Sequence, residues 1–460
     1  MDEQEIADQR KLFGTNGIRG IIGPEMNAEL ALGIGSAVGT ILPGEIIVGT
    51  DSRTSNQMLK NALISGLLAT GCDAIDIDLA PTPSVQYSVA KSDASAGVVI
   101  TASHNPPEFN GIKVIDSDGT ELDFSKELEI EKRYFSREFK TIDWKSVGKL
   151  KKDKHANERY SKAIASLVNR KTISDASLRI IVDCSNGVGG LVTPGLLSSF
   201  DVDVMTLNAQ PHGSFPGHPS EPTPENLSEL MKMVIAEGAS FGNAQDGDAD
   251  RSIFIDDKGS YITGDKSFAL LAGYLSSKNP GAIVVSTVAT SDVVSDMVIK
   301  NGGKIVQTRV GSPIVARKMK EIGAIFGGEE NGGLIYAKHQ YCRDAAMTTA
   351  LMAQLAAERG ALSEQLKELP VYHQSKLKTA CPNEKKKRVL ASLAESMKDK
   401  RVDLTDGVKI FEGERDWVII RPSGTEQIFR IFSQSRSEDV AKSLADRYMS
   451  VLQEIIAETS

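Results

Sequence analysis

The sequence predicts an α/β protein of four domains, in which three similarly built α/β domains precede a small α+β domain. The chain has 460 residues, which is too long for one hydrophobic core and corresponds to three or four domains of ordinary size. Short β-branched runs recur along the first three-quarters of the chain, each followed by small polar residues and a helix-like stretch. Residues 370–460 break this alternation.

Three apolar runs are expected to form central strands, at residues 45–51, 178–184 and 281–287. Each has apolar residues at consecutive positions, which indicates a strand that is buried on both faces beneath helices. Such strands in alternation with helices predict α/β sheets. We therefore expect one plan to be repeated three times, although the three runs share little sequence identity.

The C-terminal segment has a different pattern. Strand-like runs at residues 416–421 and 428–432 flank a tight loop, and a final amphipathic helix is expected at residues 437–456. This combination predicts a small α+β domain with a hairpin-like core. The basic run at residues 385–388 opens a probable helix, and a solvated helix face explains it better than a nucleic-acid patch does.

Domain boundaries are expected where the chain is polar or contains proline. Such segments lie at residues 145–157, near 257–259 and near 368–370. The predicted domains are residues 1–150, 151–257, 258–369 and 370–460.

Composition excludes several classes of function. The 53 basic and 61 acidic residues give a net charge of −8, whereas nucleic-acid-binding domains are usually basic. No apolar run approaches the thickness of a bilayer, and the polar N-terminus is no signal or transit peptide, so we expect a cytoplasmic protein without nucleic-acid or membrane partners. The scattered cysteines predict free thiols rather than disulfides or a zinc site; they are Cys72, Cys184, Cys342 and Cys381.

The loop at residues 101–107 follows the apolar run 96–100 and contains Ser103 and His104. Polar side chains at the carboxyl end of a buried strand lie at the edge of the sheet where α/β proteins bind ligands. Ser103 could therefore act as a nucleophile or a phosphate carrier, with His104 as a hydrogen-bond donor. Taken alone, the loop fits an ordinary turn better, and no G-x-S-x-G elbow supports a hydrolase.

The segment 245–251 carries Asp246, Asp248 and Asp250 at alternate positions. Three carboxylates this close repel one another unless a cation lies between them, and hard oxygen ligands favour Mg²⁺ or Ca²⁺ over zinc. An EF-hand is excluded because Arg251 and Asp257 occupy its glycine and glutamate positions. Three protein ligands leave room for a phosphate on Mg²⁺; the alternative is an exposed acidic turn.

Two further loops suit parts of a phosphorylated sugar. The glycine-rich segment 327–333 lets the backbone approach a ligand closely, and Glu329 and Asn331 would suit sugar hydroxyls, although a mobile loop is an equally good interpretation. The segment 421–426 combines a guanidinium, hydroxyls and small-residue amides, which together predict a phosphate cradle. Arg430 could add a second guanidinium; the alternative is a plain hairpin turn.

Together the four loops have the parts that transfer of a phosphoryl group requires, namely a serine, metal-binding carboxylates, a polyol-binding loop and a phosphate cradle. The chain also resembles the α-D-phosphohexomutase family, in the family's motif order and over almost its whole length. The motifs that carry the resemblance are residues 14–20, 101–106, 110–113, 246–251, 308–311, 328–332 and 421–425. The loops at residues 329–333 and 338–341 place it nearest the archaeal-type branch.

The resemblance implies four domains around a central cleft, the first three sharing a mixed α/β/α plan. It implies that Ser103 carries a phosphoryl group and, through its phosphate, binds Mg²⁺ with the three aspartates. Arg19, Lys113 and His104 match positions close to the transferring phosphate, where acid–base help is expected. The remaining substrate-binding positions implied are Arg251, Thr308, Gly311, Glu329 and Asn331 and, for the non-reacting phosphate, Arg421, Ser423, Gly424, Thr425 and Arg430.

The implied reaction interconverts hexose 6-phosphate and hexose 1-phosphate through a phosphoserine and a 1,6-bisphosphate, which also serves as activator. Mannose and glucose phosphates are favoured, and glucosamine phosphate is the alternative. More distant alternatives are a Mg²⁺-dependent sugar phosphatase and a non-catalytic sugar-phosphate binder.

The sequence departs from the family at Gly333, where many relatives have a histidine, at Gln427 and at Asn331. A homo-oligomer is compatible with the sequence, which leaves the oligomeric state open.

Overall fold

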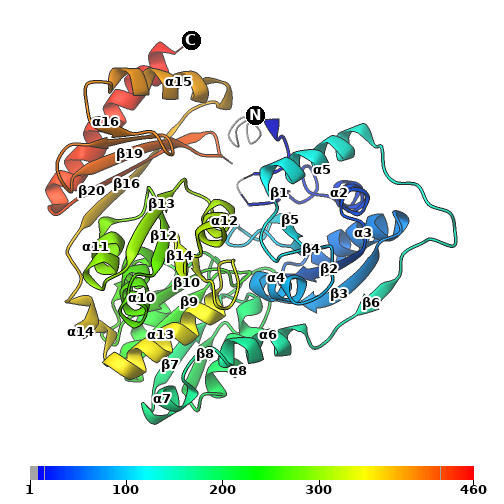
Figure 1. Cartoon of the computed structure of the whole chain (residues 1–460), viewed down its shortest axis with the longest axis horizontal. Coiled ribbons are helices and arrows are strands. Elements are labelled where there is room, and N and C mark those ends of the chain that lie inside the picture. The colour runs from blue at the N-terminus through cyan, green and yellow to red at the C-terminus, as the bar shows by residue number, and fades with distance from the viewer. Residues whose placement is uncertain (1–8, 15, 425, 460) are drawn as a thin grey trace.

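The computed structural model describes residues 9–14, 16–424 and 426–459. The chain forms four sheets, and Figure 1 shows their domains following one another in an arc, from the blue N-terminal domain to the orange and red C-terminal domain. The first sheet contains β1 (Ile18–Ile21), β2 (Glu45–Thr50), β3 (Asp73–Leu79), β4 (Ala96–Ile100), β5 (Phe109–Asp116) and β6 (Leu150–Lys152), in the order β1-β5-β4-β2-β3-β6.

The other three sheets contain the remaining strands of the described residues. The second is ordered β11-β10-β9-β7-β8 and consists of β7 (Arg179–Asp183), β8 (Asp203–Leu207), β9 (Phe241–Gln245), β10 (Ser252–Ile255) and β11 (Tyr261–Ile262). The third is ordered β13-β12-β14-β15 and consists of β12 (Ile283–Thr287), β13 (Lys304–Thr308), β14 (Phe326–Gly328) and β15 (Leu334–Tyr336). The fourth is ordered β16-β20-β19-β18-β17 and consists of β16 (His373–Ala380), β17 (Val402–Asp403), β18 (Val408–Phe411), β19 (Trp417–Pro422) and β20 (Ile428–Ser435).

The first three sheets repeat one four-strand plan, as the sequence predicts. The unit is β3-β2-β4-β5 in the first sheet, β8-β7-β9-β10 in the second and β13-β12-β14-β15 in the third. In each unit the central strand pairs in parallel with the strands on either side, and the last strand turns back antiparallel. Each unit therefore has one hairpin-like loop in the same place, between its third and fourth strands.

Helices cover these sheets and connect their strands. The first domain has α2 (Ala28–Ile41), α3 (Asn56–Ala69), α4 (Thr82–Ala90) and α5 (Phe124–Ser136); the second has α6 (Ala156–Ala165), α7 (Arg170–Asp175), η1 (Val188–Leu191), α8 (Thr193–Ser198) and α9 (Ser228–Ala236). The third has α10 (Gly264–Lys278), α11 (Asp292–Lys300), α12 (Ser312–Ile322), α13 (Ala345–Arg359) and α14 (Leu362–Leu366), and the fourth has α15 (Asn383–Ser396) and α16 (Glu438–Glu458).

The central strands are buried on both faces, which explains their consecutive apolar residues. In β2, Ile46 and Val48 belong to one core of the first domain, while Ile47 belongs to the core on the opposite face. In β7, Ile180 and Ile181 are likewise divided between two cores. Side chains of a strand alternate between its faces, so a strand with helices on both sides needs apolar residues at every position.

The second and third domains share one core, because a single cluster of buried residues includes Ile180 of β7, Phe268 of α10 and Phe326 of β14. The fourth domain has a core of its own and touches the third through Trp417, Ile419 and Val288. At this contact the buried Lys409 donates a hydrogen bond to the carbonyl of Val288 (2.8 Å). Polar contacts between the same two domains add to this cluster, among them the hydrogen bond from the Ser291 hydroxyl to Gln434 Oε1 (2.7 Å).

Two sheets extend past the predicted domain boundaries. The strand β6 crosses residue 150 and pairs in parallel with β3, and β11 lies beyond residue 257 yet pairs with β10. Polar composition predicted a linker at residues 145–157 and a boundary near 257–259, but backbone pairing adds β6 and β11 to the sheets that precede them.

All four cysteines are buried and free, as predicted. In the described part of the chain, no helix combines the length and the apolar character needed to cross a membrane.

Tyr160 of α6 fixes the start of α13, because its hydroxyl donates a hydrogen bond to Asp344 Oδ1 (2.5 Å) and Asp344 caps that helix by accepting from the backbone N–H of Met347. Replacing Tyr160 with Phe removes a buried hydrogen bond and leaves a buried carboxylate less satisfied, so we expect a loss of about 1–3 kcal/mol in the free energy of unfolding, measured in urea. Tyr134→Phe is the control, because the Tyr134 hydroxyl has no hydrogen-bond partner among the described residues. Equal stability of the two variants would contradict this role of Tyr160.

Candidate functional site

Ser103 lies in the loop between β4 and β5 and contacts the corresponding loop of the second domain. Its hydroxyl donates a hydrogen bond to Asp246 Oδ2 (2.7 Å) and lies 3.2 Å from His104 Nδ1. The side chain of Ser103 is completely buried. Its backbone has a positive φ of 52°, which is uncommon for a residue other than glycine and is often found at functional sites.

A buried arginine holds the Ser103 loop in shape. The guanidinium of Arg53 donates hydrogen bonds to the carbonyl oxygens of Ser103 (2.9 Å) and Asn105 (2.6 Å), and it pairs with Asp51. The hydroxyl of Thr101 donates to the same aspartate (2.6 Å) and accepts the backbone N–H of Ser103. The unusual backbone at Ser103 is therefore fixed by buried polar contacts.

Asp246, Asp248 and Asp250 occupy the loop between β9 and β10, and all three are buried. One carboxylate oxygen from each lies within 4.8 Å of the others, so these three side chains could hold a metal ion. The loop approaches Ser103 so closely that a Cβ at Gly247 would lie 2.7 Å from the carbonyl oxygen of Ser103, which only glycine permits. The serine and the carboxylates, far apart in the sequence, thus form one site.

Cations from two other domains balance the carboxylates. Lys113 of β5 lies between Asp248 Oδ2 (2.7 Å) and Asp250 Oδ2 (3.2 Å). Arg343, which precedes α13, donates to Asp250 Oδ2 (2.5 Å), and Arg251 Nε lies 3.9 Å from Asp250 Oδ1. These contacts join the first three domains.

The pKa values of these carboxylates reflect the charges around them. Burial raises the pKa of Asp246, and the charges of Asp250 and Asp248 raise it further. Burial would also raise the pKa of Asp250, but Arg343, Lys113 and Arg251 outweigh it and hold that pKa below its usual value. Lys113 is fully buried, yet Asp248 and Asp250 raise its pKa, so its amine remains charged.

The aspartates suit a divalent cation in their chemistry and in the atoms that they leave unpaired. Asp248 Oδ1 and Asp250 Oδ1 are buried and have no hydrogen-bond partner among the described residues. A buried carboxylate oxygen without a partner is costly, and a hard cation such as Mg²⁺ accepts such oxygens as ligands. A divalent metal therefore fits these side chains.

Arg19 and His104 lie beside this cluster. Arg19 of β1 donates to Asn105 Oδ1 in the Ser103 loop (2.8 Å). The charge of Arg251, together with burial and Arg19, holds the pKa of His104 well below its usual value. His104 is consequently neutral near pH 7.

Glu329 joins the loop between β14 and β15 to its neighbours. Its Oε1 accepts the backbone N–H of Gly311 (3.0 Å), and its Oε2 lies 3.4 Å from Arg343 Nη1. Arg343 therefore contacts both the aspartate loop and the glycine-rich loop. A Cβ at Gly333 would lie 2.2 Å from Arg343 Cδ, so the missing side chain at this position makes room for the arginine.

Asn331 and Thr308 have local contacts. Asn331 Oδ1 accepts the backbone N–H of Gly333 (3.0 Å), and the Thr308 hydroxyl donates to the carbonyl of Arg309 (2.9 Å). Gly311 has a φ of 140° and precedes α12. These three residues shape their loops in this structure.

The predicted phosphate cradle lies in the loop between β19 and β20 of the fourth domain. Arg421 and Arg430 are directly paired across the two strands, so both side chains emerge on the same face. Arg421 pairs with Asp406 (2.9 Å) and Arg430 with Glu426 (2.6 Å). Ser423 is buried and Gly424 exposed; Thr425 lies outside the described residues.

No hydrogen bond or ion pair among the described residues joins this cradle directly to Ser103 or the aspartates. Asp406 provides an indirect connection, because its Oδ2 accepts both Arg421 Nε (2.9 Å) and the backbone N–H of Val310 in the third domain (3.1 Å). The cradle thus contacts the loop that also contains Thr308 and Gly311.

Sequence reasoning missed Arg53, Arg343 and Asp406. Each acts through neighbours that are distant in the sequence, and the only local signal was that Arg53 follows a predicted strand in a polar Asp-Ser-Arg segment.

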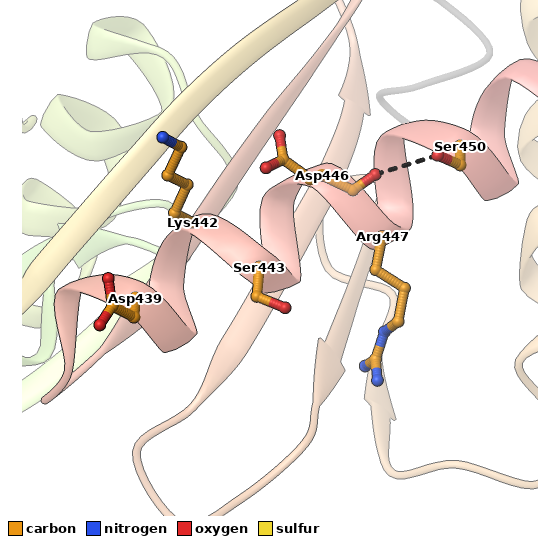
Figure 2. A pocket seen from close by; sticks show the side chains of 6 residues that line it. All are labelled: Asp439, Lys442, Ser443, Asp446, Arg447 and Ser450. Atoms are coloured by element: carbon orange, nitrogen blue, oxygen red, sulfur yellow. Dashed lines mark hydrogen bonds between the residues drawn. The ribbon is translucent and has the colours of Figure 1, made fainter.

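A shallow hollow on the outer face of α16 is unrelated to these loops (Figure 2). All its lining side chains come from this single helix, and none is a predicted site residue. They are Asp439, Lys442, Ser443, Asp446, Arg447 and Ser450.

Family models match the four domains in order. The descriptions are phosphoglucomutase/phosphomannomutase alpha/beta/alpha domain I for residues 10–141, domain II for 158–259, domain III for 263–372, and the C-terminal domain for 377–451.

Two curated relatives match almost the whole chain. A phosphoglucomutase/phosphomannomutase from Thermococcus kodakarensis is 44% identical over 455 residues, covering 97% of this chain and 99% of the relative. A probable phosphoglucosamine mutase from Methanopyrus kandleri is 40% identical, with the same coverage. Among solved structures, a phosphoglucomutase/phosphomannomutase family protein from Burkholderia thailandensis superimposes with a TM-score of 0.86 at 26% identity, covering 98% of both chains.

The position of Arg343 predicts a specific loss of stability. Arg343→Met removes the cation shared by Asp250 and Glu329, and leaving buried charges unpaired costs about 3–5 kcal/mol. We expect a loss of this order in urea unfolding without divalent metal, and a smaller loss in Mg²⁺, which would neutralise Asp250.

Arg359→Met, at the exposed end of the helix that Arg343 precedes, is the control and should change stability by about 0.5 kcal/mol or less. Equal effects of the two substitutions would contradict the role of Arg343.

Proposed function

The chain belongs to the phosphoglucomutase/phosphomannomutase family, and we propose that it moves a phosphoryl group between O1 and O6 of a hexose through a phosphorylated Ser103. The contact that carries this proposal is the 2.7 Å hydrogen bond between the Ser103 hydroxyl and Asp246. It sets a hydroxyl that could carry phosphate against a carboxylate cluster able to hold a divalent metal. Phosphoryl transfer depends mainly on such positioning and charge neutralisation.

Each neighbouring side chain has a distinct role in the proposed transfer. The phosphoserine gives its group to the sugar, and a 1,6-bisphosphate then returns its other phosphate to Ser103. Lys113 remains charged and stabilises the negative charge of the moving phosphoryl group. The sugar hydroxyl loses a proton as it attacks phosphorus, and the Ser103 oxygen gains one as its bond to phosphorus breaks. His104, 3.2 Å from that oxygen, is placed to exchange a proton with it, and Arg19 orients the phosphate from β1.

The metal proposed for the three aspartates is Mg²⁺, which when bound would neutralise charge on the serine's phosphate and polarise the P–O bond. The protein's own contribution is to fix the carboxylates and to surround them with buried cations. Glu329 and Asn331 are proposed to bind sugar hydroxyls from the third domain. Further contacts to the substrate, between the aspartate loop and the loop that contains Glu329, are proposed for Arg251, Thr308 and Gly311.

The non-reacting phosphate is proposed to bind in the cradle of the fourth domain, to Arg421, Ser423, Gly424, Thr425 and Arg430. Ser103 is fully buried, so a sugar phosphate reaches it only after the loop or a neighbouring domain moves. The separate core of the fourth domain favours motion of that domain as a unit. Partial opening would let the bisphosphate turn over while the remaining cations retain it.

Mannose and glucose phosphates are the proposed substrates, supported by the name of the 44% identical relative. Glucosamine phosphate is the second candidate, since the 40% identical relative is named a probable phosphoglucosamine mutase. These sugars differ at C2, where a small change in a polar pocket alters selectivity. The free thiols fit the cytoplasmic location expected from the sequence.

Ser103→Ala tests the phosphate carrier. We expect the conversion of glucose, mannose and glucosamine 1-phosphates to fall by about 10⁴-fold or more, as when an essential nucleophile is removed. Coupled assays for each 6-phosphate measure this, with 1,6-bisphosphate and Mg²⁺ held constant.

Ser88→Ala is the matched control, because Ser88 is a buried serine on α4 whose hydroxyl donates to the carbonyl of Ser84 in the same helix. Near-normal turnover of Ser103→Ala would overturn the phosphoserine mechanism. Free phosphate released in step with loss of the sugar phosphate would instead favour a phosphatase.

Asp248→Asn tests the metal site. Losing a charged ligand should raise the Mg²⁺ concentration for half-maximal activity by about 100-fold, while the circular dichroism spectrum stays unchanged. Asp256→Asn is the control, because Asp256 accepts backbone N–H groups in the turn after β10 and contacts none of the three aspartates. Unchanged Mg²⁺ dependence in Asp248→Asn would show that the aspartates do not bind the metal.

A further inference from the structure

Thr82 is the first residue of α4 in the first domain, and it makes two hydrogen bonds to a proposed metal ligand of the second domain. Its hydroxyl donates to Asp248 Oδ2 (2.6 Å), and its backbone N–H donates to the carbonyl oxygen of the same aspartate (3.0 Å). Both Thr82 and Asp248 are buried. The contact therefore fixes both the main chain and the side chain of Asp248.

The two oxygens of Asp248 have opposite surroundings. Oδ2 accepts hydrogen bonds from Thr82 and from Lys113 Nζ (2.7 Å), whereas Oδ1 is buried without a partner among the described residues. Asp250 has a similar division. Its Oδ2 accepts hydrogen bonds from Lys113 and Arg343, whereas its Oδ1 has no hydrogen-bond partner in the part of the chain that the structure describes and lies 3.9 Å from Arg251 Nε. In both carboxylates, protein donors saturate one oxygen and leave the other available to a cation.

From this geometry we propose that Thr82 is a positioning residue for the metal, which holds Asp248 so that Oδ1 faces the cation. Groups that bond to metal ligands set the orientation of those ligands and alter metal affinity. The inference rests on the proposed function, in that it takes the three aspartates as the metal site. It extends that site to a helix of another domain.

Thr82 differs from the other donors in carrying no charge. Removing Lys113 or Arg343 would change the electrostatic attraction for a cation as well as the orientation of the carboxylates. Thr82→Val keeps the shape of the side chain and removes only the hydroxyl donor. Its effect on metal binding therefore reports the loss of this hydrogen bond without any change in charge.

The test measures Mn²⁺ binding to the full-length protein without sugar, by electron paramagnetic resonance, and Mg²⁺ binding by calorimetry. Ser103 phosphate content is matched among the proteins by mass spectrometry. We expect Thr82→Val to weaken the binding of both metals by about tenfold, which is the lower end of the range for residues that orient metal ligands. Thr82→Ser should bind both metals with an affinity within about twofold of that of the unmodified protein. Thr82→Ala removes the same donor and replaces the Val variant if that variant does not fold.

Thr348→Val is the matched control. Thr348 is equally buried, but its hydroxyl donates to the carbonyl of Asp344 within α13 (2.7 Å), so its loss should leave metal affinity unchanged. At saturating Mg²⁺, Thr82→Val should recover nearly normal kcat with an unchanged KM for the sugar phosphate, because Thr82 acts only through the metal.

Three results would overturn the proposal: normal affinity in Thr82→Val, affinity as weak in Thr82→Ser as in Thr82→Val, or no metal binding by the unmodified protein. Mutase turnover is measured separately, so a failure of this inference is distinguishable from a failure of the proposed reaction.

Discussion

The structure depends on keeping three buried carboxylates together. Asp246, Asp248 and Asp250 repel one another strongly in a site from which water is excluded. Lys113 and Arg343 reach this loop from the first and third domains and neutralise part of its charge. The second domain itself contributes Arg251, whose Nε lies 3.9 Å from Asp250 Oδ1. The charge of one loop is thus balanced by cations from all three of the first domains.

The repeated sheet plan explains why the loops can meet. Each of the three units places a loop between its third and fourth strands, and these loops contain Ser103, the aspartates and Glu329. A loop that leaves a parallel strand at its carboxyl end lies at the edge of the sheet where ligands bind. Three copies of one architecture therefore supply three different chemical groups from equivalent positions.

The fourth domain is built and attached differently. Its antiparallel sheet has a separate core, and Asp406 connects its phosphate cradle to the third domain by accepting from both Arg421 and Val310. A phosphate bound to Arg421 would compete with Asp406 for the guanidinium. Binding of the proposed distal phosphate would then alter one of the contacts between the fourth domain and the third, which suits the reorientation proposed for the bisphosphate.

The sequence by itself determined the fold class, the repeated α/β plan, the free thiols and the loops that contain Ser103, the aspartates, Glu329 and Arg421. These features follow from local patterns, since consecutive apolar residues mark a strand buried on both faces and clustered carboxylates need a cation. The limits of the first two sheets, at β6 and β11, depended on backbone pairing that polar composition does not reveal. Only the tertiary structure decided that Thr82, Arg53, Arg343 and Asp406 belong to the site, because an ordinary threonine, arginine or aspartate acquires such a role from the side chains that folding brings beside it.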